Sequence, residues 1–154
     1  MEAVLRNNSG FSLVELIMVM VTVAIIAAIA APRYALASSR YRAEAAARRI
    51  VEDLRLARNE ARKTSASRMV VFDITGDQLM IKSIAGLDDP SATYTTQLSA
   101  PPYQAEIIEV TFPGNILVFD GFGQPSSSGK ISVKVGKTVR EITLDGATGE
   151  VQVQ

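Results

Sequence analysis

The strongest constraint on this chain is a run of 21 residues, Phe11 to Ala31, whose only charged residue is Glu15. As an α-helix rising about 1.5 Å per residue, the run is about 31 Å long, and the hydrocarbon core of a bilayer is about 30 Å thick. The run is apolar on all sides rather than along one face, which suits lipid or the inside of a helical bundle. The sequence therefore predicts a membrane-spanning helix at 11–31, and Pro32 is expected to bend or end it.

A second helical pattern follows Pro32. Its apolar residues recur at steps of three and four, the spacing of one buried helical face, and Val51 widens the stripe: Ala47, Ile50, Leu54, Ala57 and Ala61. No glycine lies between Phe11 and Ser67, and Pro32 is the only proline there. We expect one long helix from about Phe11 to about Lys63, kinked at Pro32, whose second half packs on a domain.

From residue 64 to the end, the pattern changes to short strands. Runs rich in β-branched residues alternate with turns rich in Gly, Pro, Asp and Asn, which is typical of antiparallel hairpins. The expected strands are 69–74, 78–84, 106–112, 116–120, 131–135, 138–145 and 151–154, with loops at 85–105 and 121–130. The predicted fold class is α+β, with a long N-terminal helix packed on an antiparallel β-sheet domain.

The composition argues against an enzyme. The chain has no Cys, His or Trp, so it lacks disulfides, the usual zinc ligands, and the most common general bases and activated nucleophiles. Its aspartates lack EF-hand spacing, and the loop from Gly123 to Lys130 lacks the spacing of a phosphate loop. We expect no catalytic residues, no cofactor and no bound metal.

Charge is unevenly distributed, although the formal net charge is zero. Residues 33–63 hold nine basic and four acidic residues, a net charge of +5, whereas residues 64–154 hold six basic and ten acidic residues, a net charge of −4. A basic segment just beyond a span is suited to anionic lipid headgroups. A domain of negative charge lacks the electrostatic footprint of phosphate binding, so nucleic acid is not an expected partner of the domain.

Three interpretations of the N-terminus follow from the residues. An ordinary secretory signal would cleave after Ala28-Ile29-Ala30, but it would keep a carboxylate in its apolar region and leave the amphipathic helix without an anchor. An uncleaved signal anchor is the second interpretation. In the third, residues 1–10 form a leader that is cut between Gly10 and Phe11.

The third interpretation is carried by the segment GFSLVEL, Gly10 to Leu16, followed by the apolar run and Pro32. This combination resembles the type III signal of type IV pilins and type II secretion pseudopilins. The resemblance implies that a prepilin peptidase cuts after Gly10, that Phe11 becomes the N-methylated first residue, and that the helix bends at Pro32.

The same resemblance implies that Glu15 pairs with the N-terminal amine of a neighbouring subunit during assembly. A carboxylate at the centre of a span costs about 2–3.5 kcal/mol on insertion scales, and less near the end of the helix, where the positive dipole end favours it. The alternative for Glu15 is a carboxylate that merely reaches water at the interface.

The body of the chain is similar to the minor pseudopilin group GspH/FimT. The similarity lies in a helix end with Leu54, Ala57, Arg58 and Ala61, in a Phe-x-x-x-Gly turn from Phe119 to Gly123, and in a glycine-rich turn from Asp145 to Gly149. The expected organisation is a leader at 1–10, a transmembrane and assembly helix at 11–31, an amphipathic helix at 32–63, and an antiparallel β domain at 64–154.

Together, the resemblances imply a minor pseudopilin of a type II secretion system. It would be held in the bacterial inner membrane by a single span, with its C-terminal domain in the periplasm. Other pilins or pseudopilins, the prepilin peptidase and the inner membrane are the expected partners.

Two alternatives remain open. One is a minor pilin of a type IV pilus, acting in assembly or DNA uptake, although Gly149-Glu150-Val151-Gln152 lacks the positive charge of the Gly-Arg-x-Arg turn found in some DNA-uptake relatives. The other is a membrane-tethered periplasmic binding module that never joins a filament.

Overall fold

The computed structural model describes residues 11–86 and 89–154, so the predicted leader, with Gly10, lies outside the described residues. The chain divides into two compact units, Met1–Ala37 and Ser38–Gln154, which are described separately below.

A single helix, α1 (Leu13–Thr64, 52 residues), contributes to both units, which confirms the prediction of one long N-terminal helix. Glu15 lies in its first turn, and Arg62 and Lys63 lie in its last turn. The helix dipole favours a negative charge at the first end and positive charges at the second. Pro32 lies inside α1 and does not end it. The bend expected at Pro32 stays a prediction.

The strands of the second unit form two four-stranded sheets in which every pairing is antiparallel. The first sheet has the order β3-β2-β1-β5, built from β1 (Arg68–Asp73), β2 (Gln78–Ala85), β3 (Thr93–Gln97) and β5 (Ile116–Phe119). The second has the order β4-β6-β7-β8, built from β4 (Glu106–Val110), β6 (Gly129–Val135), β7 (Thr138–Leu144) and β8 (Val151–Val153). A short 3₁₀ turn, η1 (Pro113–Asn115), precedes β5.

The α+β class and the antiparallel pairing are confirmed, including the hairpins β1–β2 and β6–β7. The division into two sheets could not be read from the sequence, because strand periodicity indicates a buried face but not the partner of each strand. The loop predicted at 85–105 also contains β3. Its sequence, TYTTQ, is mostly polar, yet Tyr94 and Thr96 alternate inward while their neighbours face solvent.

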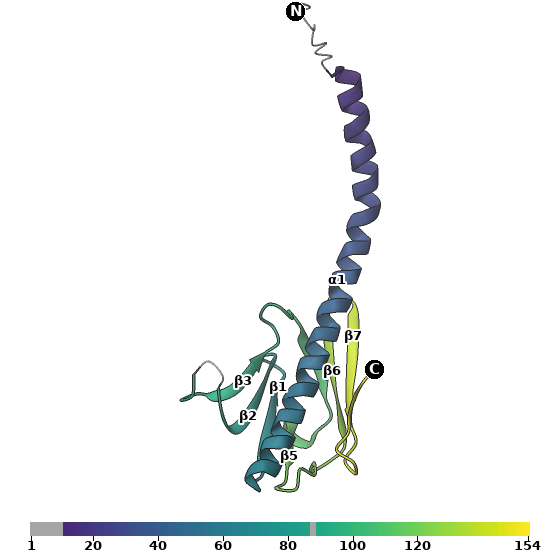
Figure 1. Cartoon of the computed structure of the whole chain (residues 1–154). Coiled ribbons are helices and arrows are strands. Elements are labelled where there is room, and N and C mark those ends of the chain that lie inside the picture. Colours follow the sequence, from purple (N-terminus) through teal and green to yellow (C-terminus); the bar gives the residue numbers. More distant parts are fainter. Residues whose placement is uncertain (1–10, 87–88) are drawn as a thin grey trace, which may run out of the picture. The chain divides into compact units, whose positions relative to one another are not determined.

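The core of the second unit lies between α1 and both sheets (Figure 1). The six helix residues predicted to form the buried stripe are all buried, and Ala43, Ala46 and Asp53 are buried with them. Five of these nine side chains are alanine. Each fully buried Ile or Leu, such as Ile50 and Leu54, stabilises the fold by about 1.5–3 kcal/mol.

Candidate assembly site

No residue of the described part of the first unit, 11–37, is buried, and residues 11–31 present an apolar surface. α1 is long and apolar enough to cross a membrane, and no part of its apolar stretch is buried. The one hydroxyl near its middle, Thr22, donates to the carbonyl of Met18 at 2.8 Å, so no polar donor of that side chain is left for lipid. The segment is therefore suited to lipid or to packing between helices.

Two predicted site residues lie at the start of this surface. Phe11 is 82% exposed and lies two residues before the start of α1, and Glu15 is exposed in the first turn of the helix. Within residues 11–86 and 89–154, no cation forms an ion pair with Glu15. The carboxylate is therefore available to a group outside the described part of the chain.

Small residues recur on this helix at steps of three and four, at Ala24, Ala27, Ala28 and Ala31. At that spacing they lie on one face of a helix. Small side chains let two helix backbones approach closely, which is how helices associate where no hydrophobic effect drives them together. All four are exposed, so this face is open to a neighbouring helix.

In the second unit, Arg58 connects the three segments that carry the family resemblance: the end of α1, the turn at 119–123 and the turn at 145–149. Its guanidinium donates three hydrogen bonds to backbone carbonyls: Nε to Gly123 at 3.1 Å, Nη1 to Gly149 at 2.8 Å and Nη2 to Thr148 at 2.8 Å. One turn later, Nε of Arg62 donates to the carbonyl of Phe122 at 2.9 Å. The end of α1 thus holds two turns that are distant in sequence, and we call this set of contacts the arginine joint.

Glycine is required at two positions of the arginine joint. Gly123 and Gly149 have φ angles of +77° and +67°, which other residues rarely adopt. A Cβ at Gly149 would also lie 2.9 Å from Cζ of Arg58, and one at Gly123 would contact the side chain of Arg62 more closely still. The glycines in the family pattern therefore let the two turns reach the arginines.

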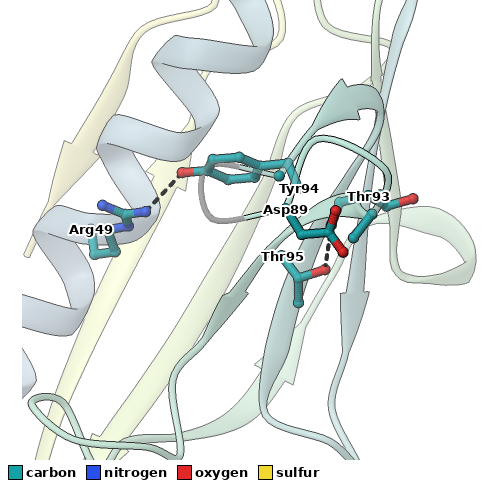
Figure 2. Close-up of a pocket in the computed structure, with 7 residues that line it drawn as sticks. Arg49, Asp89, Thr93, Tyr94 and Thr95 are labelled. Atoms are coloured by element: carbon teal, nitrogen blue, oxygen red, sulfur yellow. Dashed lines mark hydrogen bonds between the residues drawn. The ribbon is translucent and has the colours of Figure 1, made fainter.

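A buried carboxylate, which the sequence did not indicate as special, ties α1 to β3. Asp53 is 2% exposed, and its Oδ1 accepts a hydrogen bond of 2.6 Å from the hydroxyl of Tyr94. Nε of Arg49 lies 3.2 Å from the same oxygen, and Nη2 of Arg49 donates to the Tyr94 hydroxyl at 2.8 Å. Burial raises the pKa of Tyr94, and its hydrogen bond to Asp53 acts in the same direction. Figure 2 shows Arg49 reaching from the helix to Tyr94.

A shallow pocket of about 230 Å³ lies beside this contact, lined by Arg49, Gly86, Asp89, Ala92, Thr93, Tyr94 and Thr95 (Figure 2). Its charged groups already have partners, since Arg49 bonds Tyr94 and Asp89 bonds Ser91. Among the described residues, no three His, Cys, Asp or Glu side chains are placed to hold a metal ion. The two charged side chains of this pocket therefore take part in contacts of the fold.

Replacing Tyr94 with phenylalanine is expected to destabilise the chain by about 1.5–3 kcal/mol, because the buried Asp53 loses the only neutral hydrogen-bond donor that the described residues give it. Urea unfolding of the full chain in detergent micelles measures the effect. Tyr103→Phe is the matched control: this half-buried tyrosine forms no side-chain hydrogen bond within the described residues, so its loss should stay within about 0.5 kcal/mol. Equal effects of the two substitutions would contradict the role given to Tyr94.

Comparison with known proteins agrees with this geometry. Residues 46–149 match the family described as Type II transport protein GspH. The chain belongs to the GspH family. In this GspH-family chain, residues 5–31 also match the prokaryotic N-terminal methylation motif, which agrees with a membrane-anchored subunit. The family consists of structural pilin and pseudopilin subunits. No curated protein sequence matches the chain.

Solved structures show the same fold at low identity. The type IV minor pilin FimU of Pseudomonas aeruginosa superposes with a TM-score of 0.56 at 17% identity, over 75% of this chain and 90% of FimU. The minor pseudopilin EpsH of the Type 2 Secretion System of Vibrio cholerae superposes with a TM-score of 0.57 at 15% identity, over 73% of this chain and 96% of EpsH. The pilin-like fold is therefore confirmed.

Proposed function

We propose that this chain is a minor pseudopilin, a structural subunit of the pseudopilus of a type II secretion system. The observation that carries the proposal is the exposed apolar half of α1, attached to a GspH-family domain. The first turn of this helix holds a carboxylate, Glu15, that has no ion-pair partner among the described residues. Such a helix has two suitable environments, lipid before assembly and a bundle of like helices after it.

In this proposal, a prepilin peptidase removes residues 1–10 by cutting between Gly10 and Phe11, and Phe11 is then N-methylated. The cut creates a positively charged amine near the level of Glu15 in a neighbouring subunit. When an amine and a carboxylate pair in an apolar bundle, their attraction offsets the free-energy cost of removing each charge from water. Either charge alone would bear that cost without compensation. Processing therefore makes the subunit competent to assemble.

Assembly in this proposal is extraction from the inner membrane. Residues 11–31 exchange lipid for helix–helix packing, with the alanine face at 24–31 allowing close approach. Pro32 supplies a bend between this segment and the amphipathic segment 32–63, and the β domain, 64–154, remains in the periplasm. The other pseudopilins and the prepilin peptidase are the partners this requires.

A minor pilin of a type IV pilus is the second candidate, favoured by the likeness of the fold to FimU. Deleting the gene and measuring two outputs, release of type II substrates and surface piliation, separates the candidates. We expect substrate release to fall about tenfold or more with piliation intact, and a plasmid copy to restore it. Loss of piliation with normal release would assign the chain to a pilus, and loss of neither would favour a tethered binding module.

A further inference from the structure

The basic residues of α1 differ in whether they have a hydrogen-bond or ion-pair partner within the chain. Seven of them, from Arg42 onward, donate to a carboxylate, a carbonyl or another side chain of this chain: Arg42, Arg48, Arg49, Arg55, Arg58, Arg62 and Lys63. Within residues 11–86 and 89–154, the structure gives no such partner to Arg33 or Arg40. Seven of the nine basic residues of α1 therefore have a partner within the chain, and Arg33 and Arg40 have none among the described residues.

Arg33 and its neighbour Tyr34 lie directly after the apolar surface. Both are exposed, Tyr34 to 77%, and Ala31 ends the apolar run two residues earlier. By helical rise, Arg33 is about 3 Å beyond the end of the run and Tyr34 about 4.5 Å. The headgroup layer on each side of a bilayer is about 5–7 Å thick. Both residues are therefore at headgroup depth if residues 11–31 fill the hydrocarbon core.

We propose that Arg33 and Tyr34 bind the headgroup of an anionic phospholipid and so hold the unassembled subunit in the membrane. The guanidinium forms two parallel hydrogen bonds to phosphate oxygens, and the tyrosine ring lies at the boundary between acyl chains and headgroups, where aromatic side chains are enriched. The inference rests on the proposed function only in requiring that residues 11–31 span a membrane.

A carboxylate of a second copy of the chain is a poorer partner for Arg33. Of the carboxylates that the structure describes, all but two already accept an ion pair or a hydrogen bond, and those two are Glu15 and Glu150. Under the proposed function Glu15 pairs with an amine, which leaves Glu150 alone. Lipid phosphates, in contrast, are abundant at the depth of Arg33.

The two flanks of the apolar run also differ in charge. Residues 1–10 carry one basic and one acidic residue, whereas residues 32–42 carry three arginines and no acidic residue. Basic residues on the flank that crosses the membrane oppose translocation, because positive flanks are retained on the cytoplasmic side. With the β domain in the periplasm, arginines on that flank are costly unless they have a function there, and headgroup binding supplies one.

The chain contains its own matched control. Arg40 and Tyr41 repeat the Arg-Tyr pair seven residues later, and Tyr41 is also 77% exposed. Seven residues add about 10.5 Å of helical rise, so counted along the helix this pair begins about 13.5 Å after Ala31, which is more than the thickness of a headgroup layer. The two pairs have the same chemistry and differ in their distance along the helix from the apolar run.

The test uses the full chain reconstituted in vesicles of equal parts phosphatidylglycerol and phosphatidylcholine. The chain has no tryptophan, so Tyr34→Trp introduces a single fluorescent reporter at the proposed site, and Tyr41→Trp introduces one at the control site. In each preparation one of the two lipids carries bromine near the headgroup end of its acyl chains. Quenching then reports which lipid contacts the indole.

For Tyr34→Trp we expect brominated phosphatidylglycerol to be preferred about fivefold over brominated phosphatidylcholine, the ratio expected for one basic residue at an anionic surface. Adding Arg33→Gln should remove the preference, and adding Arg40→Gln should leave it unchanged. Tyr41→Trp should be quenched weakly by both lipids.

Equal quenching of Tyr34→Trp by the two lipids, or a preference that survives Arg33→Gln, would overturn the inference and leave the membrane span intact. Quenching by neither lipid would overturn the span itself, and with it the proposed function. If Arg33→Gln lowers incorporation into filaments while the lipid preference persists, the partner of Arg33 is a neighbouring subunit and the lipid assignment is wrong.

Discussion

Replacing Glu15 with alanine is expected to lower incorporation of the subunit into filaments by about 100-fold or more, while the chain still inserts in the membrane. In the bundle, the amine of a neighbouring Phe11 would lose its carboxylate, and a buried charge left without its partner costs about 3–5 kcal/mol. Insertion should not suffer, because removing the only charge from the apolar run makes the run more compatible with lipid. Sheared filaments and membrane fractions, quantified by immunoblot, measure the two quantities separately.

Two further substitutions at this position separate charge from size. Glu15→Gln keeps the shape and removes the charge, so it should behave like alanine, whereas Glu15→Asp keeps the charge and should restore part of the incorporation. Thr22→Val is the matched control in the same helix, since among the described residues the Thr22 hydroxyl bonds only to the carbonyl of Met18. Normal incorporation of Glu15→Ala would favour the tethered binding module.

Replacing Arg58 with alanine is expected to destabilise the second unit by about 2–4 kcal/mol. Three carbonyls lose a charged donor at once, and each hydrogen bond of this kind contributes about 1.5–3 kcal/mol when buried. Water reaches part of this site, which keeps the total below the sum of the three. Urea unfolding of the full chain in micelles measures the loss.

Arg55 is the matched control for Arg58. It lies three residues earlier in the same helix, and among the described residues its side chain forms only an exposed ion pair with Glu52, at 2.7 Å. Arg55→Ala should cost no more than about 0.5 kcal/mol. Arg58→Lys should recover little, because an ammonium cannot reach three carbonyls with the geometry of a guanidinium. A loss at Arg58 no greater than that at Arg55 would contradict the arginine joint.

The elements predicted from the sequence are those with a strong periodicity. The apolar run and the stripe of Ala47 to Ala61 each repeat over several turns, and the helix formed from Leu13 to Thr64 accordingly. The hairpin β1–β2 was also predicted, because the Thr75-Gly76-Asp77 turn separates two β-branched runs. In these cases local pattern and final fold agree.

The features that could not be predicted depend on contacts between distant residues. Asp53 lies on the buried side of α1 among apolar residues. Its partner Tyr94 is 41 positions later, and the sequence around Asp53 does not indicate that contact. The same is true of Arg58, whose partners lie 65, 90 and 91 positions away. The family pattern includes the helix end and both turns, and the structure shows that Arg58 connects them through hydrogen bonds.

The cut between Gly10 and Phe11 is the central claim, because it creates the amine for which Glu15 is proposed as partner. The most direct test is the intact mass of the chain purified from the membranes of a host that has a prepilin peptidase. We predict a chain that begins at Phe11 and carries one methyl group on its amine. A chain that begins at Met1 or at Ala31 would contradict the claim.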